Sequence, residues 1–397
     1  MIARFGLRLV REVDPRLLWN LAYRCGWGNV RAINNFNRRL KRGEFFPAFL
    51  FLSITNRCNL SCKGCWVTPS TPPVDMELGV LGNIITECKR KGTNFFGILG
   101  GEPLLHSGLM ELFALHQDCY FVLFTNGMLL DYEVAERLRQ LGNVTPLISI
   151  EGLEEESAAR RGGSGVYGSA LDALRYCHEN RLFTGVATSI TQNSIDDLVC
   201  EKFVNEMARR GAHYLWYYIY RPVGPNPSPE RALGTEQILR LRRFIVDARV
   251  TAPLLIVDAY WDHEGRALCP AVSGIAHHIA PNGAVELCPV IQFSRENVGQ
   301  GTNLSSLFQQ SALLKDFRSE TAKRTRGCII MEDPQWLADF ALRHNASDSS
   351  GRGSAIEEIE NFGCCPSHHI PGGDIPEKSW VYRFAKKHWF FGFGAYG

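Results

Sequence analysis

The chain has 397 residues, of which 45% are hydrophobic and 21% are charged, and its formal net charge is +2. These values predict a globular protein with a full core, organised as one large domain and a smaller one. We find no apolar run long enough to span a bilayer and no cleavable signal peptide. Thirteen cysteines are an odd number for a disulfide-stapled secreted protein, so they favour reduced thiols that hold metal in the cytoplasm.

The charge is unevenly distributed along the chain. Residues 1–45 carry ten Arg or Lys against three Asp or Glu (net +7), residues 378–397 carry four Lys or Arg and no acid, and the middle is left with −9. Both ends mix these cations with aromatic residues, which suits the headgroup layer of a membrane or a partner protein. We consider it equally plausible from the sequence that both ends pack against the main domain instead. We expect a cytoplasmic protein that allows peripheral contact with a membrane surface, and no nucleic-acid partner.

Short apolar runs alternate with amphipathic stretches from about residue 46 to 220, which is typical of strand–helix units around a parallel sheet. The predicted strands are 48–54, 95–99, 120–124, 145–150, 183–190 and 213–219. The predicted helices are 76–91, 108–116, 131–141, 167–180 and 195–210, with a further helix at 235–249. We therefore predict an α/β fold, a partial (β/α)6 barrel of the TIM type that is open on one side.

Composition changes divide the chain into five predicted segments. A Pro-rich stretch at 221–229 ends the repeat, and beyond residue 266 the alternation gives way to cysteines and glycines. We predict a basic N-terminal helical segment (1–45), the partial barrel (46–229), a bridging helix segment (230–265), a smaller irregular α+β cysteine-rich domain (266–370) and a basic aromatic tail (371–397). Residues 343–355 are expected to form a mobile loop.

Three closely spaced cysteines, Cys58, Cys62 and Cys65, follow the first predicted strand. Three thiols on one short loop can hold three irons of a [4Fe–4S] cluster and leave the fourth iron open to a ligand. The loop lies at the carboxyl end of its strand, where α/β barrels place their active sites. The sequence therefore predicts a metal-based active site at this edge.

The next three strands end in polar glycine turns: Gly100-Gly101-Glu102, Thr125-Asn126-Gly127 and Ser149-Ile150-Glu151. Glycines let a ligand approach the backbone closely, and a carboxylate beside them can hold an ammonium group. Each turn alone is a weak signal. In register with the cysteine loop, they indicate a binding site for a small polar molecule.

Together these motifs resemble the radical S-adenosylmethionine (SAM) superfamily over about residues 46–225. The resemblance implies that a [4Fe–4S] cluster on the three cysteines binds the amino and carboxylate groups of SAM. It also implies roles for Gly100, Gly101 and Glu102 at the methionine amino group, for Ser149 and Glu151 at the ribose, for Arg161 (with Arg160 as the alternative) at the carboxylate, and for Thr125, Asn126, Thr188 and Asn193 elsewhere in the pocket. Many members carry an aromatic residue just before the third cysteine, near the adenine. Gly64 stands there in this chain, and Trp66 could replace that aromatic residue.

A second set of cysteines lies in the C-terminal part. Cys269, Gly283 and Cys288 resemble the opening of the auxiliary-cluster extensions called SPASM and twitch. The resemblance implies a second, auxiliary [4Fe–4S] cluster, held by Cys269, Cys288, Cys328 and either Cys364 or Cys365. Four thiolates also suit tetrahedral zinc, which stays the alternative for this site.

The remaining candidates have structural explanations. Five further cysteines fall on predicted strands or helix faces and are expected to be buried and inert: Cys25, Cys88, Cys119, Cys177 and Cys200. We expect two histidine pairs, His277-His278 and His368-His369, to lie in loops, where they are weak candidates for metal ligands. Alternation places Tyr218 and Tyr220 on one face of the last barrel strand and Tyr217 on the other.

The resemblance implies reductive cleavage of SAM to a 5′-deoxyadenosyl radical, which abstracts hydrogen from an unactivated carbon of a peptide or another large substrate. A reductant protein of the flavodoxin or ferredoxin type would supply the electron. The basic aromatic termini and Gly64 favour an alternative, the modification of a lipid or isoprenoid chain at a membrane surface. A non-catalytic Fe–S electron carrier is the third hypothesis.

Overall fold

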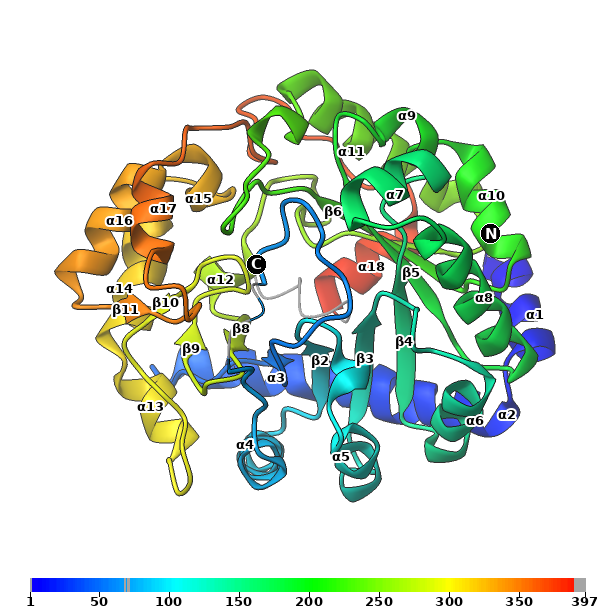
Figure 1. Cartoon of the computed structure of the whole chain (residues 1–397), viewed down its shortest axis with the longest axis horizontal. Helices are drawn as coiled ribbons and strands as arrows, with labels where there is room; N and C mark the ends of the chain where they lie inside the picture. Colours follow the sequence, from blue (N-terminus) through cyan, green and yellow to red (C-terminus); the bar gives the residue numbers. More distant parts are fainter. Residues whose placement is uncertain (1, 68, 70–71, 389–397) are drawn as a thin grey trace.

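The protein is described here from a computed structural model, which covers residues 2–67, 69 and 72–388. Residues 389–397 of the predicted tail lie outside the described residues. The structure confirms the predicted α/β fold: a curved, mostly parallel sheet is surrounded by helices (Figure 1). None of the helices in the described ranges combines the length and apolar character that a bilayer crossing requires.

The main sheet has nine strands in the order β7-β6-β5-β4-β3-β2-β1-β8-β9. Its strands are β1 (Phe49–Ser53), β2 (Phe95–Leu99), β3 (Tyr120–Thr125), β4 (Val144–Ser149), β5 (Gly185–Ile190), β6 (Tyr214–Ile219), β7 (Leu255–Val257), β8 (Ala276–Ile279) and β9 (Val285–Glu286). Only β9 runs antiparallel to its neighbour. A separate two-stranded sheet pairs β10 (Phe293–Ser294) with β11 (Ser347–Asp348). The six predicted barrel strands thus correspond to β1–β6.

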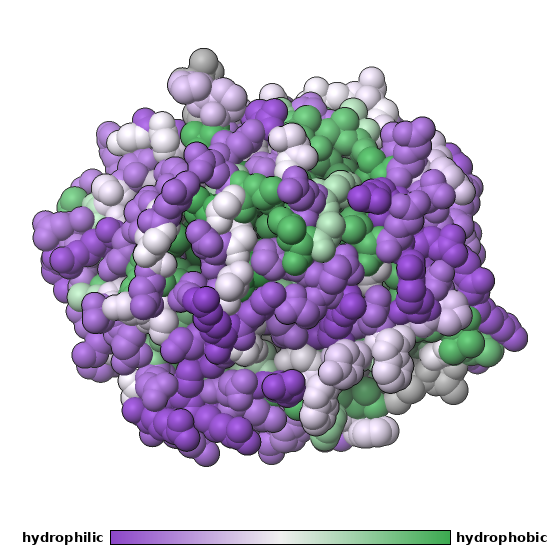
Figure 2. Space-filling view, turned by 90° about the horizontal axis from the view of Figure 1, so that it is seen from below, coloured by the Kyte–Doolittle hydropathy of each residue, from purple (hydrophilic) through white to green (hydrophobic). Residues whose placement is uncertain are grey.

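The helices that follow the barrel strands are α4 (Leu78–Arg90), α5 (Leu109–Leu115), α6 (Tyr132–Leu141), α7 (Glu154–Arg161), α8 (Val166–Glu179), α9 (Ile195–Leu198), α10 (Glu201–Arg209) and α11 (Thr235–Thr251). Short 3-10 turns add η2 (Pro103–Leu105) and η3 (Pro229–Arg231). The predicted helix 195–210 is wrong in one respect, because Cys200 adopts extended backbone angles and separates α9 from α10. Figure 2 shows the face that lies at the bottom of Figure 1. This face is mostly hydrophilic, and hydrophobic residues are visible in gaps between the hydrophilic ones.

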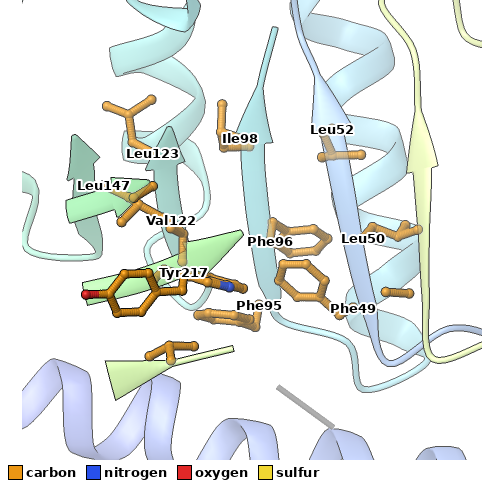
Figure 3. Close-up of a cluster of buried hydrophobic side chains, with 14 of the residues drawn as sticks. Phe49, Leu50, Leu52, Phe95, Phe96, Ile98, Val122, Leu123, Leu147 and Tyr217 are labelled. Carbon is orange, nitrogen blue, oxygen red and sulfur yellow. The ribbon is translucent and has the colours of Figure 1, made fainter. Parts of the chain in front are cut away.

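The core fills the sheet interior. Parallel strands are covered on both faces, so their sequences are nearly continuous apolar runs such as the Phe49–Ser53 stretch of β1. Figure 3 shows side chains of neighbouring strands packed against each other, with Leu50 of β1 beside Phe96 of β2. The register of β2 and β3 pairs Phe96 with Phe121. This rigid layer places the carboxyl ends of β1–β6 along one edge.

The C-terminal part contributes strands to the main sheet. Its elements besides β8–β11 are α12 (Pro270–Ser273), α13 (Leu304–Gln310), α14 (Ala312–Thr321), α15 (Ile329–Glu332), α16 (Pro334–Arg343), α17 (Ala355–Glu360) and α18 (Trp380–His388). The expectation of His277 and His278 in a loop is wrong, because both are buried on β8, which pairs in parallel with β1. Buried strands exclude water from these rings, so they pack as core groups.

The N-terminal segment runs along the amino ends of the strands. It consists of α1 (Ile2–Glu12), α2 (Pro15–Asn20), the π-helical η1 (Leu21–Trp27) and α3 (Gly28–Lys41), which cross the back of the view in Figure 1. Side chains of Arg8, Asn20 and Arg39 donate to the carbonyls of Pro253, Gly142 and Lys91, in the turns before β7, β4 and β2. The described part of both termini thus docks on the barrel, as one alternative predicted.

Candidate active site

The cysteine loop is anchored to the end of the neighbouring strand. The backbone N–H of Gly101 donates to the Thr55 carbonyl at 2.9 Å, and that of Glu102 donates to the Arg57 carbonyl at 2.7 Å. A Cβ on residue 101 would lie 2.1 Å from the Arg57 carbonyl oxygen, so only glycine permits this close approach. The Gly-Gly-Glu turn therefore holds the cysteine loop in place.

All three loop cysteines line one cavity of about 390 Å³. Burial raises the pKa of Cys58 and of Cys62, against a lowering by the nearby Arg161 guanidinium, and it raises the pKa of Cys65 to about 12. The thiols are therefore protonated at neutral pH in the metal-free protein. Metal binding would have to release these protons, as it does at thiolate sites in general.

Glu102 is fully buried behind the cavity wall. Its carboxylate accepts hydrogen bonds from the Thr125 hydroxyl at 2.9 Å and from the backbone N–H of Asn126 at 2.8 Å. Burial raises its pKa, and these donors oppose the rise. Gly100 and Gly101 line the cavity and Glu102 does not, so in this arrangement its carboxylate joins the ends of β2 and β3.

Asn126 fastens the cysteine loop from the next strand. Its Nδ2 donates to the Asn59 side-chain oxygen at 2.8 Å, and Asn59 lies between the first two cysteines of the loop. Thr125 and Asn126 both line the cavity. The predicted polar turn after β3 therefore lies at the site and supports it.

Glu151 forms ion pairs with two arginines at the site. Its carboxylate pairs with Arg160 and, at 3.1 Å, with Arg161, and it accepts the backbone N–H of Ser189 at 2.9 Å. Both guanidinium groups are nearly buried, at 9% and 7% exposure, and line the cavity with Ser149 and Glu151. The structure thus brings these four predicted residues together, although the Glu151 carboxylate already accepts hydrogen bonds from protein donors.

Several buried polar atoms at the cavity have no hydrogen-bond partner among the described residues, among them the Nε of Arg161, the hydroxyl of Thr188 and the Nε2 of His277. Unpaired buried polar atoms cost free energy, so they indicate a ligand that would satisfy them. The charge of Arg161 acts on Cys58, Cys62 and Glu102 and that of Arg160 acts on Cys62 and Cys65, so it is the unpaired Nε that favours Arg161 over Arg160. Asn193 is exposed and does not line the cavity, so the structure does not bring it to the site.

Part of the second set of cysteines lines the same cavity. Cys269, Cys288 and Cys328 contribute to its wall, whereas Cys364 is exposed, Cys365 is half-buried, and neither lines it. The structure therefore brings together three of the five predicted auxiliary ligands. Of the cysteines expected to be inert, all are buried except Cys200, which is half-buried.

Sequence reasoning missed Arg221, which lies among these thiols. Its Nε donates to the Cys328 sulfur at 3.1 Å, and its guanidinium stacks on the Tyr260 ring at 5.2 Å. His368 is also at the wall, and burial lowers its pKa to about 3, so its ring is neutral. An arginine before a proline-rich stretch carries no local signal for such a role.

Comparison with known proteins relates part of the chain to one enzyme superfamily. Residues 52–198 match the family model of the Radical SAM superfamily. The chain is 29% identical to Fe-coproporphyrin III synthase of Methanosarcina barkeri over 37% of this chain and 38% of the relative. It is 27% identical to sporulation killing factor maturation protein SkfB of Bacillus subtilis over 56% of this chain and 54% of the relative. It is 26% identical to mycofactocin maturase MftC of Mycolicibacterium smegmatis over 73% of this chain and 77% of the relative. The chain spans about half or less of the length of the first two relatives.

The fold is similar to that of two solved structures. One is Streptococcus suis SuiB bound to precursor peptide SuiA, with a TM-score of 0.59 and 16% identity over 71% of this chain and 69% of that chain. The other is anSMEcpe with bound AdoMet, with a TM-score of 0.56 and 16% identity over 81% and 93%.

The parallel barrel, the three-cysteine loop and the unpaired polar atoms beside it define a metal site built to receive a small polar ligand. Residues 52–198 therefore carry a radical SAM domain, and the enzymes of that superfamily use a [4Fe–4S] cluster and SAM as cofactors.

Proposed function

We propose that this protein cleaves SAM reductively and abstracts hydrogen from a peptide substrate, with an auxiliary cluster in the same cavity. One observation carries the proposal: two sets of three cysteines, distant in the sequence, line a single cavity. A volume of about 390 Å³ falls within the usual range for small-molecule sites. A substrate in this cavity would therefore lie close to both metal positions.

The donor sets fit the two clusters. Cys58, Cys62 and Cys65 would hold the first cluster, and Cys269, Cys288 and Cys328 the second, with Cys364 or Cys365 as its predicted fourth ligand. The chemistry that a bound, reduced cluster would supply there is one electron for the cleavage of SAM into methionine and a 5′-deoxyadenosyl radical. We propose a flavodoxin or ferredoxin as the electron source.

The chain's own residues bind the ligand and keep water away. The Arg161 guanidinium would pair with the SAM carboxylate, and the Thr188 hydroxyl would hydrogen-bond to the nucleoside. Phe51, Phe124 and Trp216 form an apolar part of the cavity wall, which excludes water from a reactive radical. Burial raises the pKa of Tyr218, Tyr220 and Tyr260, so these phenols at the cavity stay protonated.

A peptide is the favoured substrate class. SkfB and MftC are a maturation protein and a maturase, and SuiB was solved with its precursor peptide. The second candidate is a lipid or isoprenoid chain, which the exposed aromatic residues of the termini favour. The pocket with unpaired polar groups argues against a pure electron carrier, because such a protein has no need of a site for SAM.

Cofactor chemistry is tested with the anaerobically reconstituted full chain, dithionite and SAM. We expect 5′-deoxyadenosine from the wild type, none from Cys62→Ala, and wild-type amounts from Cys200→Ala, a matched control outside the cavity. Product from Cys62→Ala would overturn the proposal, and so would wild-type protein that binds no SAM. In the triple variant Cys58→Ala/Cys62→Ala/Cys65→Ala we expect iron at the second site; zinc alone would refute the auxiliary cluster.

Substrate class is tested by isotope transfer. The reconstituted protein is incubated with SAM and either the peptide or the lipid fraction of cells grown in deuterated medium. Hydrogen abstraction would place deuterium in 5′-deoxyadenosine. We expect deuterium with the peptide fraction; deuterium with the lipid fraction alone would replace the peptide by the second candidate.

A further inference from the structure

The exposed hydrophobic side chains of this protein are concentrated in its terminal segments. Among the described residues, seven of thirteen exposed large hydrophobic side chains belong to the N-terminal helices or to α18. They include Trp19 at 69% exposure, Tyr23 at 58% and Trp27 at 57%. Large aromatic residues are usually mostly buried, so three in one short segment need an explanation.

These three residues lie on the outward side of one continuous helix. α2, η1 and α3 follow each other without a break, and the aromatic residues recur at intervals of four, through the π-helical turn. The rings of Trp19 and Tyr23 stack with centroids 6.3 Å apart. Cys25 and Phe36, on the same helix, are buried against the barrel. The helix is thus amphipathic, but its outer side carries aromatic rings.

The same outer side continues in cations. Arg31, Arg38 and Lys41 are exposed and follow Trp27 by four, eleven and fourteen residues, the spacing of one helical face. Few acids neutralise them, because Glu12 pairs with Arg8 and Asp14 pairs with Arg139. We call Trp19, Tyr23, Trp27, Arg31, Arg38 and Lys41 the aromatic–basic face.

We propose that the aromatic–basic face docks the protein on the surface of an anionic lipid bilayer. Trp and Tyr rings are amphipathic and favour the headgroup layer, where each ring replaces contact with water by contact with acyl chains. Arg and Lys are attracted to anionic headgroups over about a Debye length. No described helix could cross the bilayer, so the contact is peripheral.

Docking through this face sets the orientation of the cavity. Arg8, Asn20 and Arg39 tie the N-terminal helices to the turns that precede strands, at the amino ends of the sheet. The cysteine loop lies at the carboxyl ends, on the front of Figure 1. The cavity therefore faces away from the bilayer. Where the proposed function holds, this orientation favours a peptide from the aqueous side over an embedded lipid chain.

The proposal is tested by co-sedimentation of the full chain with vesicles of phosphatidylcholine, alone or mixed with phosphatidylglycerol. We expect binding to the mixed vesicles that falls as salt is raised. Trp19→Ser/Trp27→Ser should lower the partition coefficient by at least about tenfold, because two large apolar surfaces are lost. Arg31→Glu/Arg38→Glu should abolish the preference for anionic vesicles. The matched control, Leu115→Ser/Leu342→Ser, removes side chains of 60% and 59% exposure elsewhere and should bind like wild type.

Circular dichroism shows whether each variant is folded, and these positions are exposed, so we expect unchanged spectra. Absence of vesicle binding by the wild type would overturn the proposal, as would equal binding by the Trp variant. Sedimentation equilibrium is the second readout: a wild-type dimer that the Trp variant dissociates would make the face an interface between copies. None of these outcomes depends on SAM cleavage, so failure here is distinct from failure of the proposed function.

Discussion

The hydroxyl of Tyr220 lies where a side chain of residue 64 would be: a Cβ built on Gly64 would be 1.9 Å from the Tyr220 Oη. Gly64 directly precedes Cys65 and adopts a φ of +67°, which other residues rarely tolerate. The Tyr220 ring lies under the Arg160 guanidinium at 5.0 Å and is 2% exposed. The aromatic side chain of Tyr220, which directly follows β6, therefore occupies the space that a larger residue 64 would fill.

Gly64→Ala should destabilise the metal-free chain by about 2–4 kcal/mol in urea unfolding, because it combines left-handed backbone strain with a clash. Gly43→Ala is the matched control: its φ is +72° and nothing lies within 4 Å, so it reports the strain alone. Adding Tyr220→Ala to Gly64→Ala should remove the clash. The double variant should therefore be less destabilised than the sum of the two single variants predicts, and the difference is the coupling free energy. Equal effects of Gly64→Ala and Gly43→Ala would contradict this account.

Thr188→Val should weaken SAM binding without destabilising the fold, because the Thr188 hydroxyl is buried and lacks a partner among the described residues. We expect a loss of affinity of about fivefold to tenfold, the value of one hydrogen bond. Isothermal calorimetry on reconstituted protein measures it. Thr321→Val is the control, since that hydroxyl is equally buried and unpartnered but lies outside the cavity. Unchanged affinity in Thr188→Val would exclude Thr188 from the pocket.

Arg221→Met should lower the reduction potential of the proposed auxiliary cluster. The guanidinium donates to the Cys328 sulfur, and a nearby cation stabilises the more negative, reduced state. Spectroelectrochemistry on the variant that lacks the first three cysteines isolates this cluster. Arg324→Met, which breaks an exposed pair with Asp333, should leave the potential unchanged. A potential that does not move in Arg221→Met would show that this arginine does not act on the metal.

A buried charge cluster holds α18 on the barrel. Arg242, Arg249 and Lys386 surround Asp258 and Glu377, and all five side chains are at most 1% exposed. Burial alone would raise the pKa of Asp258, but the three cations lower it below its usual value. Burial lowers the pKa of Lys386 to about 8. The cluster thus depends on its two carboxylates to offset the charges of its three cations.

Asp258→Asn should destabilise the protein by about 3–5 kcal/mol, because it leaves buried cations without a counter-charge. Chemical unfolding with fluorescence detection measures this change. Asp247→Asn is the control: its pair with Lys378 is exposed, and the expected change is within about 0.5 kcal/mol. Since the Asp258 pKa is lowered on folding, its stabilisation is present at neutral pH and is lost as the pH falls through the acidic range. A mild effect of Asp258→Asn would mean that solvent reaches the cluster.

Several elements were predictable because their signals are local. The apolar runs of β1–β6 and the amphipathic helices between them depend on periodicity within ten or so residues. The short strands β7 and β8 were missed, since three or four residues carry no period and the histidines of β8 resembled ligands. Sequence alternation predicted that Tyr218 and Tyr220 lie on one face and Tyr217 on the other, and in the structure the first two line the cavity whereas Tyr217 does not.

The sequence by itself determined the three-cysteine loop, because residues 58–65 are neighbours along the chain and their spacing survives any fold. Only the tertiary structure decided that Cys269, Cys288 and Cys328 share the cavity with that loop, and that Arg221 lies among them. It also decided which side chains of the docked terminal helices are buried and which stay exposed. These relationships join residues far apart in the chain, and they follow from strand order and packing, which no short stretch of sequence encodes.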